Sequence, residues 1–378
     1  MDTQTIVIGA GPAGLAIGAC LQRAGVSSLL LEQSDQVGSA WRHHYDRLHL
    51  HTDKASSALP YVPFPPGYPR YPSRQQVIDY LEAYARRFDL DIRFGHRVTS
   101  ARRDAGRWLV ETQSGQFTAP SLVIAAGYNC EPYLPSWPGQ NDFKGELLHS
   151  SLYRNGRPYR GQRVLVVGYG NSGGEIAIDL FESGAQPALA VRGPVNVVPR
   201  ELFGIPILTV AGLERWLPPS LADALNAPIL DIALGGVRRA GLRYLPYGPL
   251  AGVASHGRVP LIDVGTIRLL RRQKIALYPG LERFTEKGVV FAGGRQADFE
   301  AVILATGYRA RVDSFLGAAP ELLDADGMPH ISGREAPVAG LYFCGYALSP
   351  AGMLNQIARE ARAISAAIAD KQTAARPA

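Results

Sequence analysis

Two glycine-rich loops constrain the fold of this chain more than any other feature. The first, Gly9–Gly14 with the sequence GAGPAG, follows the apolar run Ile6–Ile8. The second, Gly168–Gly173 with the sequence GYGNSG, follows Val164–Val167. Each loop therefore has a strand before it and a helix after it, the context in which such glycines bring the backbone close to a pyrophosphate. The sequence predicts two dinucleotide sites in one chain.

The residue that ends the second strand of each unit carries a different charge. Glu32 comes shortly after Leu29–Leu31, where a carboxylate can hydrogen-bond a ribose diol. Arg192 follows Ala188–Val191, where a guanidinium suits a 2′-phosphate that a carboxylate would repel. The first loop is therefore predicted to bind FAD and the second NADPH. Arg200 is a candidate for a second anion contact.

Composition bounds the class of protein. The 378 residues carry a net charge of +6 that is spread along the chain, so no nucleic-acid arm is predicted. The three cysteines are far apart in sequence and form no CxxC pair, which argues against a zinc site or a dithiol redox pair. No metal is expected. No apolar run reaches the ~18 residues that span a bilayer, and the first strand begins near residue 4, so we expect a cytoplasmic protein without a membrane span.

The organisation along the chain predicts an α/β fold. A first βαβ unit covers about residues 3–33, a loop-rich stretch runs over 34–72, and Ser73 is a candidate N-cap for a helix over 75–88. Residues 91–124 alternate like the strands of a small meander. A proline-punctuated linker at 132–139 indicates a domain crossing.

The second half repeats this plan. A second unit starts near residue 162, an apolar helical insertion covers 201–256, and a meander covers 275–300. The strand at 301–308 echoes 122–128, which suggests related modules. A final helix is expected over 354–369 and a frayed tail over 371–378.

The predicted fold class is two Rossmann-like dinucleotide-binding domains with the NADPH domain inserted into the FAD domain. The boundaries place the FAD domain at 1–138 and 298–378 and the NADPH domain at 139–297.

A segment before the second loop resembles a known signature. Residues 143–153 fit F-x-G-x-x-x-H-x-x-x-Y, which is similar to the signature of class B flavoprotein monooxygenases, although the Trp/Pro ending of the Baeyer–Villiger branch is missing. The segments 45–51, 198–204, 260–266 and 304–309 resemble those of plant YUCCA-type enzymes, which convert indole-3-pyruvate to indole-3-acetate. The resemblance covers nearly the whole chain.

The resemblance implies a monooxygenase with two cofactors. NADPH would reduce FAD, and O2 would add to form a flavin C4a-(hydro)peroxide that attacks a carbonyl or gives oxygen to a soft N or S atom. Oxidative decarboxylation of an aryl 2-keto acid and N- or S-oxygenation of small amines or sulfides both stay open. A non-catalytic flavin-binding redox sensor is the alternative from a different class. The partners are O2 and a small organic substrate, without nucleic acid, and a homodimer is left open.

The resemblance also assigns roles to single residues. His51 stands where animal flavin-containing monooxygenases have an Asn that faces the flavin, and an imidazole there can donate to oxygen or shuttle a proton. A loop histidine that serves only the structure is the alternative. Asn171 and Ser172 are placed near the nicotinamide and flavin, with capping of the helix as the structural alternative. His51 and Asn171 are the catalytic candidates. His149 and Tyr153 are expected to organise the domain crossing. The insertion at 201–256 is expected to form a wall or lid on the substrate side, with association at a membrane surface as the rival interpretation.

The cofactor-binding candidates complete the prediction. For the two loops and the residues that follow them they are Gly9, Gly11, Pro12, Ala13, Gly14, Glu32, Gly168, Gly170, Asn171, Ser172, Gly173, Arg192 and Arg200. Further candidates are Gln33, Trp41, Val98, Ala126, Gly127, Thr306, Gly307, Gly345 and Leu354.

Overall fold

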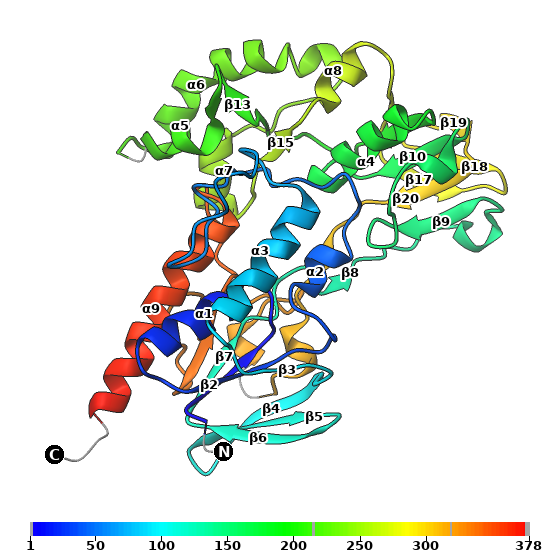
Figure 1. The fold of residues 1–378 in the computed structure, drawn as a ribbon. Coiled ribbons are helices and arrows are strands. Elements are labelled where there is room, and N and C mark those ends of the chain that lie inside the picture. The colour runs from blue at the N-terminus through cyan, green and yellow to red at the C-terminus, as the bar shows by residue number, and fades with distance from the viewer. Residues whose placement is uncertain (1–2, 214–215, 318–319, 375–378) are drawn as a thin grey trace. The chain divides into compact units, whose positions relative to one another are not determined.

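Each of the two units of this chain is built around a parallel sheet with helices beside it (Figure 1). The structure is a computed structural model, and it describes residues 3–213, 216–317 and 320–374. Unit 1 contains residues 1–42, 53–131 and 308–378. Unit 2 contains residues 43–52 and 132–307. The predicted α/β class with two Rossmann-like units is confirmed.

Unit 1 is built on a five-stranded parallel sheet. In pairing order its strands are β22 (Leu341–Phe343), β7 (Ser121–Ile124), β1 (Thr5–Ile8), β2 (Ser28–Leu31) and β3 (Ile92–Arg93). Every residue of β1 is buried, as expected for a central strand covered on both faces. Helix α1 (Pro12–Arg23) connects β1 to β2 and packs on α9 (Met353–Ala374).

Helix α3 (Arg74–Arg87) begins where the sequence predicted. The Ser73 hydroxyl accepts a hydrogen bond from the Gln76 amide, and the Gln76 side chain accepts one from the Ser73 amide. This reciprocal pair is a capping box that satisfies two donors at the helix start. The prediction of Ser73 as the N-cap is therefore confirmed. The short helix α2 (Ser39–Arg42) precedes it in the chain.

The first meander is smaller than predicted. Its antiparallel strands are β4 (Val98–Asp104), β5 (Arg107–Thr112) and β6 (Gly115–Ala119). The flanking strands β3 and β7 pair instead with β2 and β1 in the parallel sheet. Short apolar runs do not reveal which sheet a strand will join, because that depends on partners far away in sequence.

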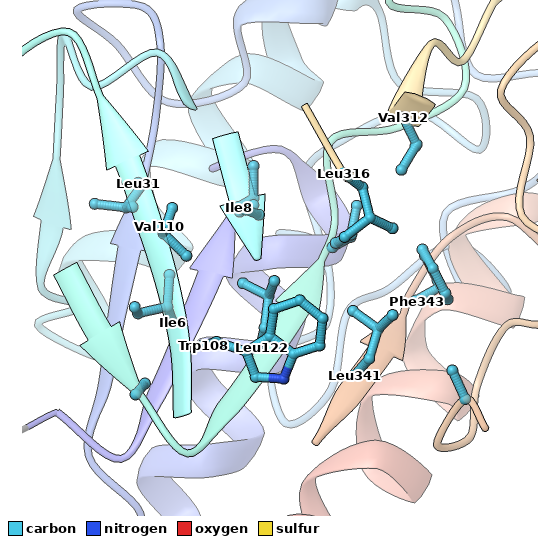
Figure 2. Packing of buried hydrophobic residues seen from close by; sticks show 14 of the residues in the cluster. Ile6, Ile8, Leu31, Trp108, Val110, Leu122, Val312, Leu316, Leu341 and Phe343 are labelled. Atoms are coloured by element: carbon cyan, nitrogen blue, oxygen red, sulfur yellow. The ribbon is translucent and has the colours of Figure 1, made fainter. Parts of the chain in front are cut away.

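The core of unit 1 lies between the parallel sheet and this meander. Trp108 is fully buried there, and its indole N–H donates to the Ala339 carbonyl at 3.2 Å. Figure 2 shows its ring beside Leu122 and Leu341, which belong to the sheet. Burial of an aromatic ring with its one polar atom hydrogen-bonded stabilises the contact between the two layers.

Unit 2 repeats the arrangement. In pairing order its sheet contains β16 (Ala276–Tyr278), β11 (Gln186–Ala190), β10 (Arg163–Val167), β20 (Ala301–Leu304) and β9 (Glu146–His149). Helix α4 (Asn171–Glu182) connects β10 to β11. An antiparallel meander contains β17 (Leu281–Phe284), β18 (Gly288–Phe291) and β19 (Gln296–Asp298).

The boundary of unit 2 differs from the sequence-based boundary. The sequence assigned residues from 298 onward to the FAD domain, whereas contacts group the chain up to Gly307 with unit 2. The reason is that β20 pairs in parallel with β10, as β7 pairs with β1 in unit 1. The segment 43–52 also belongs to unit 2, although its neighbours in sequence on both sides belong to unit 1.

The insertion is helical, as predicted. It contains the helices α5 (Ile207–Leu213), α6 (Pro219–Leu234) and α7 (Pro249–His256). Two short strand pairs accompany them. Strand β12 (Val197–Pro199) pairs with β15 (Leu261–Asp263), and β13 (Glu201–Leu202) pairs with β14 (Ile205–Pro206). Helix α8 (Thr266–Arg271) follows. The strands β8 (Glu131–Pro132) and β21 (Tyr308–Arg309) stand where the chain passes between units.

The last helix is longer than predicted. Helix α9 continues to Ala374, so residues 371–374 are helical rather than frayed, and residues 375–378 lie outside the described part. Its buried face ends at Ile368, and Lys371 in the added turn pairs with Glu335. Within the described residues, no helix is long and apolar enough to cross a membrane.

Candidate functional site

The first glycine loop is a tight turn that only glycine permits. Gly9 has φ +104°, and a Cβ there would lie 2.7 Å from the Ala125 carbonyl oxygen. A Cβ on Gly14 would lie 1.9 Å from the Gly9 carbonyl oxygen. Gly11 differs from both, because a Cβ there would meet no atom within 4 Å. The loop therefore packs closely at its first and third glycines and leaves open space at its second.

The second loop has the same geometry. Gly168 also has φ +104°, and a Cβ there would lie 2.5 Å from the Ala305 carbonyl oxygen. A Cβ on Gly173 would lie 2.1 Å from the Gly168 carbonyl oxygen, and one on Gly170 would again meet nothing within 4 Å. Open space at the second glycine is where a dinucleotide pyrophosphate approaches the backbone in folds of this kind.

Both helices that follow the loops begin without a side-chain cap. Gly11 is the N-cap of α1 and Gly170 the N-cap of α4, and no side chain in the described residues caps either. The helical ladders start with the Leu15 amide on Gly11 and the Gly174 amide on Gly170, both at 3.0 Å. The amides before them can bind an anion. Both loops fit a pyrophosphate.

Glu32 lies directly beside the first loop. Its carboxylate accepts hydrogen bonds from the Ala10 amide at 2.7 Å and from the Ser34 amide and hydroxyl at 2.9 and 2.8 Å. These donors hold the carboxylate at the carboxyl end of β2, in the position from which it would bind a ribose diol. They also stabilise the loop itself, because Glu32 is buried.

Several other candidates of unit 1 gather around the same loop. A Cβ on Gly9 would lie 3.2 Å from the Ala126 Cα, and one on Gly345 would lie 3.2 Å from the Ala13 Cβ. Trp41 is tied to the loop through Gly38, whose carbonyl accepts from the Trp41 amide and whose amide donates to the Ala10 carbonyl.

The remaining unit 1 candidates are less clearly placed at the loop. Gly127 has φ +83° and follows the strand that closes on Gly9. Leu354 lies in the first turn of α9, Gln33 is exposed, and Val98 packs against the hydrophobic core of unit 1. Their roles stay predictions.

Sequence reasoning missed Glu360 in unit 1. This buried carboxylate on α9 accepts from the Gly345 amide at 2.7 Å and from the Ser332 hydroxyl at 2.8 Å. It fixes the turn that brings Gly345 against Ala13. A charged residue on the otherwise apolar face of a helix was the signal that could have identified it.

In unit 2, Arg192 stands just past β11 on an exposed position. Its side chain packs against Gly280, where an added Cβ would lie 3.2 Å from the Arg192 Cγ. Arg200 lies in a cavity of about 330 Å³, which is also lined by Asp263 and Arg268. Burial raises the pKa of the Asp263 carboxyl, and hydrogen bonds from the amides of Ile267, Gly265 and Thr266 oppose that rise. Glu201 also lines this cavity, so its two guanidinium groups, which can bind an anion, stand beside two carboxyl groups.

Asn171 and Ser172 form the first turn of α4. The Asn171 side chain does not cap the helix; its Oδ1 accepts from the Ile262 amide at 2.9 Å and so ties β15 to the helix start. Thr306 and Gly307 follow β20 in unit 2, and a Cβ on Gly168 would lie 3.9 Å from the Thr306 amide nitrogen.

His51 contacts the helix that follows the second loop. Its Nε2 is hydrogen-bonded to Oε1 of Glu175, a buried carboxylate on α4 that sequence reasoning missed. Only 16% of the His51 side chain is exposed and 6% of the Glu175 side chain. His51 and Glu175 are separated by 124 positions, so no local pattern could have paired them.

Segment 43–52, which we call the strap, is held on α4 and the adjacent loop. Arg47 pairs with Glu182 on α4, two turns beyond Glu175. The Asn155 side-chain amide donates to Asp46 at 2.9 Å. These contacts explain why the strap belongs to unit 2 although the sequence suggests only a loop.

His149 and Tyr153, the two signature residues, are buried in unit 2. The Ser151 amide donates to His149 Nδ1 at 3.1 Å, so the proton of the neutral ring is on Nε2, which donates to the Gly307 carbonyl at 3.1 Å. Burial lowers the pKa of His149, partly opposed by this carbonyl. The Tyr153 hydroxyl donates to Asp179 on α4 at 2.6 Å. Both residues hold structure together, consistent with their expected organising role.

Cysteines and metal ligands give no site in the described residues. Cys20, Cys130 and Cys344 are all free thiols, and no group of three or more His, Cys, Asp or Glu residues could hold a metal ion there. Burial raises the pKa of Cys344 well above its ordinary value, which keeps this thiol protonated.

Comparison with known proteins identifies the family. The model of the pyridine nucleotide-disulphide oxidoreductase family matches residues 6–199. The indole-3-pyruvate monooxygenase YUCCA1 of Oryza sativa subsp. japonica is 41% identical over 352 residues, which is 90% of this chain and 86% of the relative. The probable indole-3-pyruvate monooxygenase YUCCA1 of Arabidopsis thaliana is 41% identical over 330 residues, covering 86% of this chain and 80% of the relative.

A solved structure agrees with these relatives. The flavin-containing monooxygenase from Stenotrophomonas maltophilia matches with a TM-score of 0.75 and 25% identity, covering 100% of both chains. The identity to the plant enzymes extends over most of the chain. The chain therefore belongs to the YUCCA-type branch of the flavin-containing monooxygenases.

Proposed function

We propose that this protein uses FAD, NADPH and O2 to decarboxylate an aryl 2-keto acid oxidatively, with indole-3-pyruvate as the substrate. The observation that carries the proposal is the 41% identity over 352 residues to an enzyme named for that substrate. In the overall reaction the keto acid, NADPH, O2 and a proton give the shortened acid, CO2, NADP⁺ and water. The flavin, when bound, would supply the redox chemistry.

The two loops divide the binding of the cofactors. Gly9, Gly11 and Gly14 hold the FAD pyrophosphate at the start of α1, with Glu32 on the ribose. Gly168, Gly170 and Gly173 hold the NADPH pyrophosphate at the start of α4, with Arg192 on the 2′-phosphate. The cavity lined by Arg200 and Arg268 supports a second phosphate contact.

The insertion contributes the apolar wall that an aryl substrate requires. Phe203, Leu225 and Ile232 all present exposed apolar side chains there. Sites for small organic molecules are lined mainly by such side chains, with a few polar groups that fix orientation. An aryl 2-keto acid combines both needs, because its ring is apolar and its carboxylate is anionic.

His51 acts in the oxygen half of the reaction. Its largely buried imidazole can take up and return a proton and so assist the attack on the keto carbonyl. Asn171 is committed to the Ile262 amide, and its role is to keep the start of α4 in place for the nicotinamide end of the cofactor.

The experiment is an assay of the purified holoenzyme with NADPH and O2 and three substrates: indole-3-pyruvate, a small tertiary amine and a small sulfide. Product mass and CO2 release are measured. We expect indole-3-acetate and one CO2 per NADPH consumed with the keto acid only. Efficient formation of an N-oxide or sulfoxide instead would establish the N- or S-oxygenation alternative. If no substrate stimulates NADPH and O2 consumption, the protein is a flavin-binding sensor.

A further inference from the structure

Glu175 has an unusual position for a carboxylate. It lies on α4, two residues past the second glycine loop, with only 4% of the residue exposed. A buried carboxylate is costly unless it is paired. In residues 3–213, 216–317 and 320–374 the one side chain that hydrogen-bonds it is His51, through Nε2.

This contact determines where His51 carries its proton. A carboxylate can only accept a hydrogen bond, so Nε2 must be the protonated ring nitrogen. The other ring nitrogen, Nδ1, has no hydrogen-bond partner in the described part of the chain. In the neutral ring Nδ1 is therefore a lone pair that can accept a proton, and in the charged ring it is a donor.

The strap that carries His51 has two further contacts with unit 2. Arg47 pairs with Glu182 at the end of α4, and Asp46 accepts from Asn155, so these attachments do not involve Glu175. The Glu175 carboxylate contacts one ring nitrogen of His51 and leaves the other available. This resembles the arrangement by which a carboxylate fixes the tautomer of a base in acyl-transfer enzymes.

We propose that Glu175 is a positioning residue for His51, which makes Nδ1 the atom that takes up and returns a proton. The inference rests on the proposed function, in which His51 serves the oxygen half of the reaction. Nδ1 forms an N–H bond while an O–H bond of the reacting oxygen species breaks, and the electron pair stays on that oxygen, which attacks the keto carbonyl. The imidazolium is balanced by the Glu175 carboxylate until the proton returns to oxygen in the product water.

The first test observes the tautomer directly, without turnover. Protein labelled with ¹⁵N-histidine is studied by NMR, and the His51 signals are assigned among the eight histidines by comparison with His51→Gln. We expect the proton on Nε2 at pH 8 in the unchanged protein and loss of this fixed tautomer in Glu175→Gln, which keeps the size of the side chain. A proton on Nδ1 in the unchanged protein would overturn the inference.

The second test measures coupling, which is the product formed per NADPH consumed. In Glu175→Gln we expect flavin reduction by NADPH within about twofold of normal, but product formation to fall roughly 100-fold, with hydrogen peroxide formed instead. Glu182→Gln is the matched control, because it loosens the strap on the same helix without touching His51. It should leave both the tautomer and the coupling unchanged.

The outcomes separate this inference from the proposed function. If His51→Gln loses coupling but Glu175→Gln does not, His51 acts without Glu175 and the inference fails alone. If neither variant loses coupling, the role of His51 itself is wrong. If Glu182→Gln loses coupling as much as Glu175→Gln, the pair only attaches the strap.

Discussion

The two nucleotide loops have nearly identical backbones and different surroundings. Both first glycines have φ +104°, and both second glycines face open space. However, the fifth residue of helix α1 is Ala16, which is fully buried, whereas the fifth residue of α4 is Glu175, which holds His51. The first helix has an apolar side chain at this position, and the second has a carboxylate in a polar contact. The two loops are thus alike in backbone geometry, and the pair of His51 and Glu175 is found beside only the second.

The edge strands of the two sheets differ in the same sense. Phe343 pairs with Ile124 in unit 1, and His149 pairs with Leu304 in unit 2. Phe343 contributes to the hydrophobic core, while His149 reaches the Gly307 carbonyl. Equivalent positions therefore tolerate a polar group where a nearby backbone oxygen can satisfy it.

The largest expected effect comes from filling the open space of each loop. Gly11→Ala and Gly170→Ala place a methyl group where no protein atom lies within 4 Å, at backbone angles that any residue adopts. The fold should be unaffected. The pyrophosphate would meet the methyl group, and overpacking of about 1–3 kcal/mol or more predicts up to roughly 100-fold weaker binding.

Each loop variant should lose only its own cofactor. Flavin content measured by absorbance should fall in Gly11→Ala, and NADPH affinity measured by titration should fall in Gly170→Ala with the flavin retained. Loss of FAD from the Gly170→Ala protein would mean that the cofactors are assigned to the wrong loops.

The second prediction concerns Arg192, which follows β11 in unit 2. Arg192→Ala should raise the KM for NADPH by roughly one to two orders of magnitude, because a charge-assisted contact to phosphate contributes about 1.5–3 kcal/mol. Its KM for NADH should be nearly unchanged. Steady-state kinetics with both nucleotides provide the internal control. An equal loss with both would show that Arg192 supports the packing at Gly280 rather than the 2′-phosphate.

The smallest expected effect is the contribution of His149 to the pH dependence of folding stability. The pKa of His149 is lowered in the folded state by burial, so above about pH 6.5 both folded and unfolded chains carry it neutral. As the pH falls below that value, the unfolded chain binds a proton that the folded chain does not, and stability decreases. His149→Phe, which copies the Phe343 of unit 1, should show a smaller decrease of Tm between pH 7 and pH 5.5. An unchanged decrease would assign the pH dependence to other groups.

The two glycine loops could be predicted from the sequence, but the polar contacts around them could not. Each glycine loop is a local pattern whose backbone requirements are visible in six residues. The pair His51 and Glu175 joins positions 124 apart. The strap looks like an ordinary loop because its partners Glu182 and Asn155 lie 135 and 109 positions further along the sequence.

The prediction of which sheet two short strands join was wrong for a related reason. Ile92–Arg93 and Ser121–Ile124 were expected to belong to a meander, yet they complete the parallel sheet. Runs of two to four apolar residues specify a strand but not its neighbours, which are selected by contacts distant in sequence. The assignment of β20 to unit 2 follows from the same kind of distant pairing.

The central claim is that His51, which contacts Glu175 on α4, serves the oxygen half of the reaction and not hydride transfer. The most direct measurement follows His51→Ala in two steps: anaerobic reduction of its flavin by NADPH, then the yields of product and hydrogen peroxide in air. We predict a near-normal reduction rate, with hydrogen peroxide replacing most of the product. Normal coupling, or slow reduction with normal coupling, would contradict the account and leave His51 as the residue that attaches the strap to Glu175.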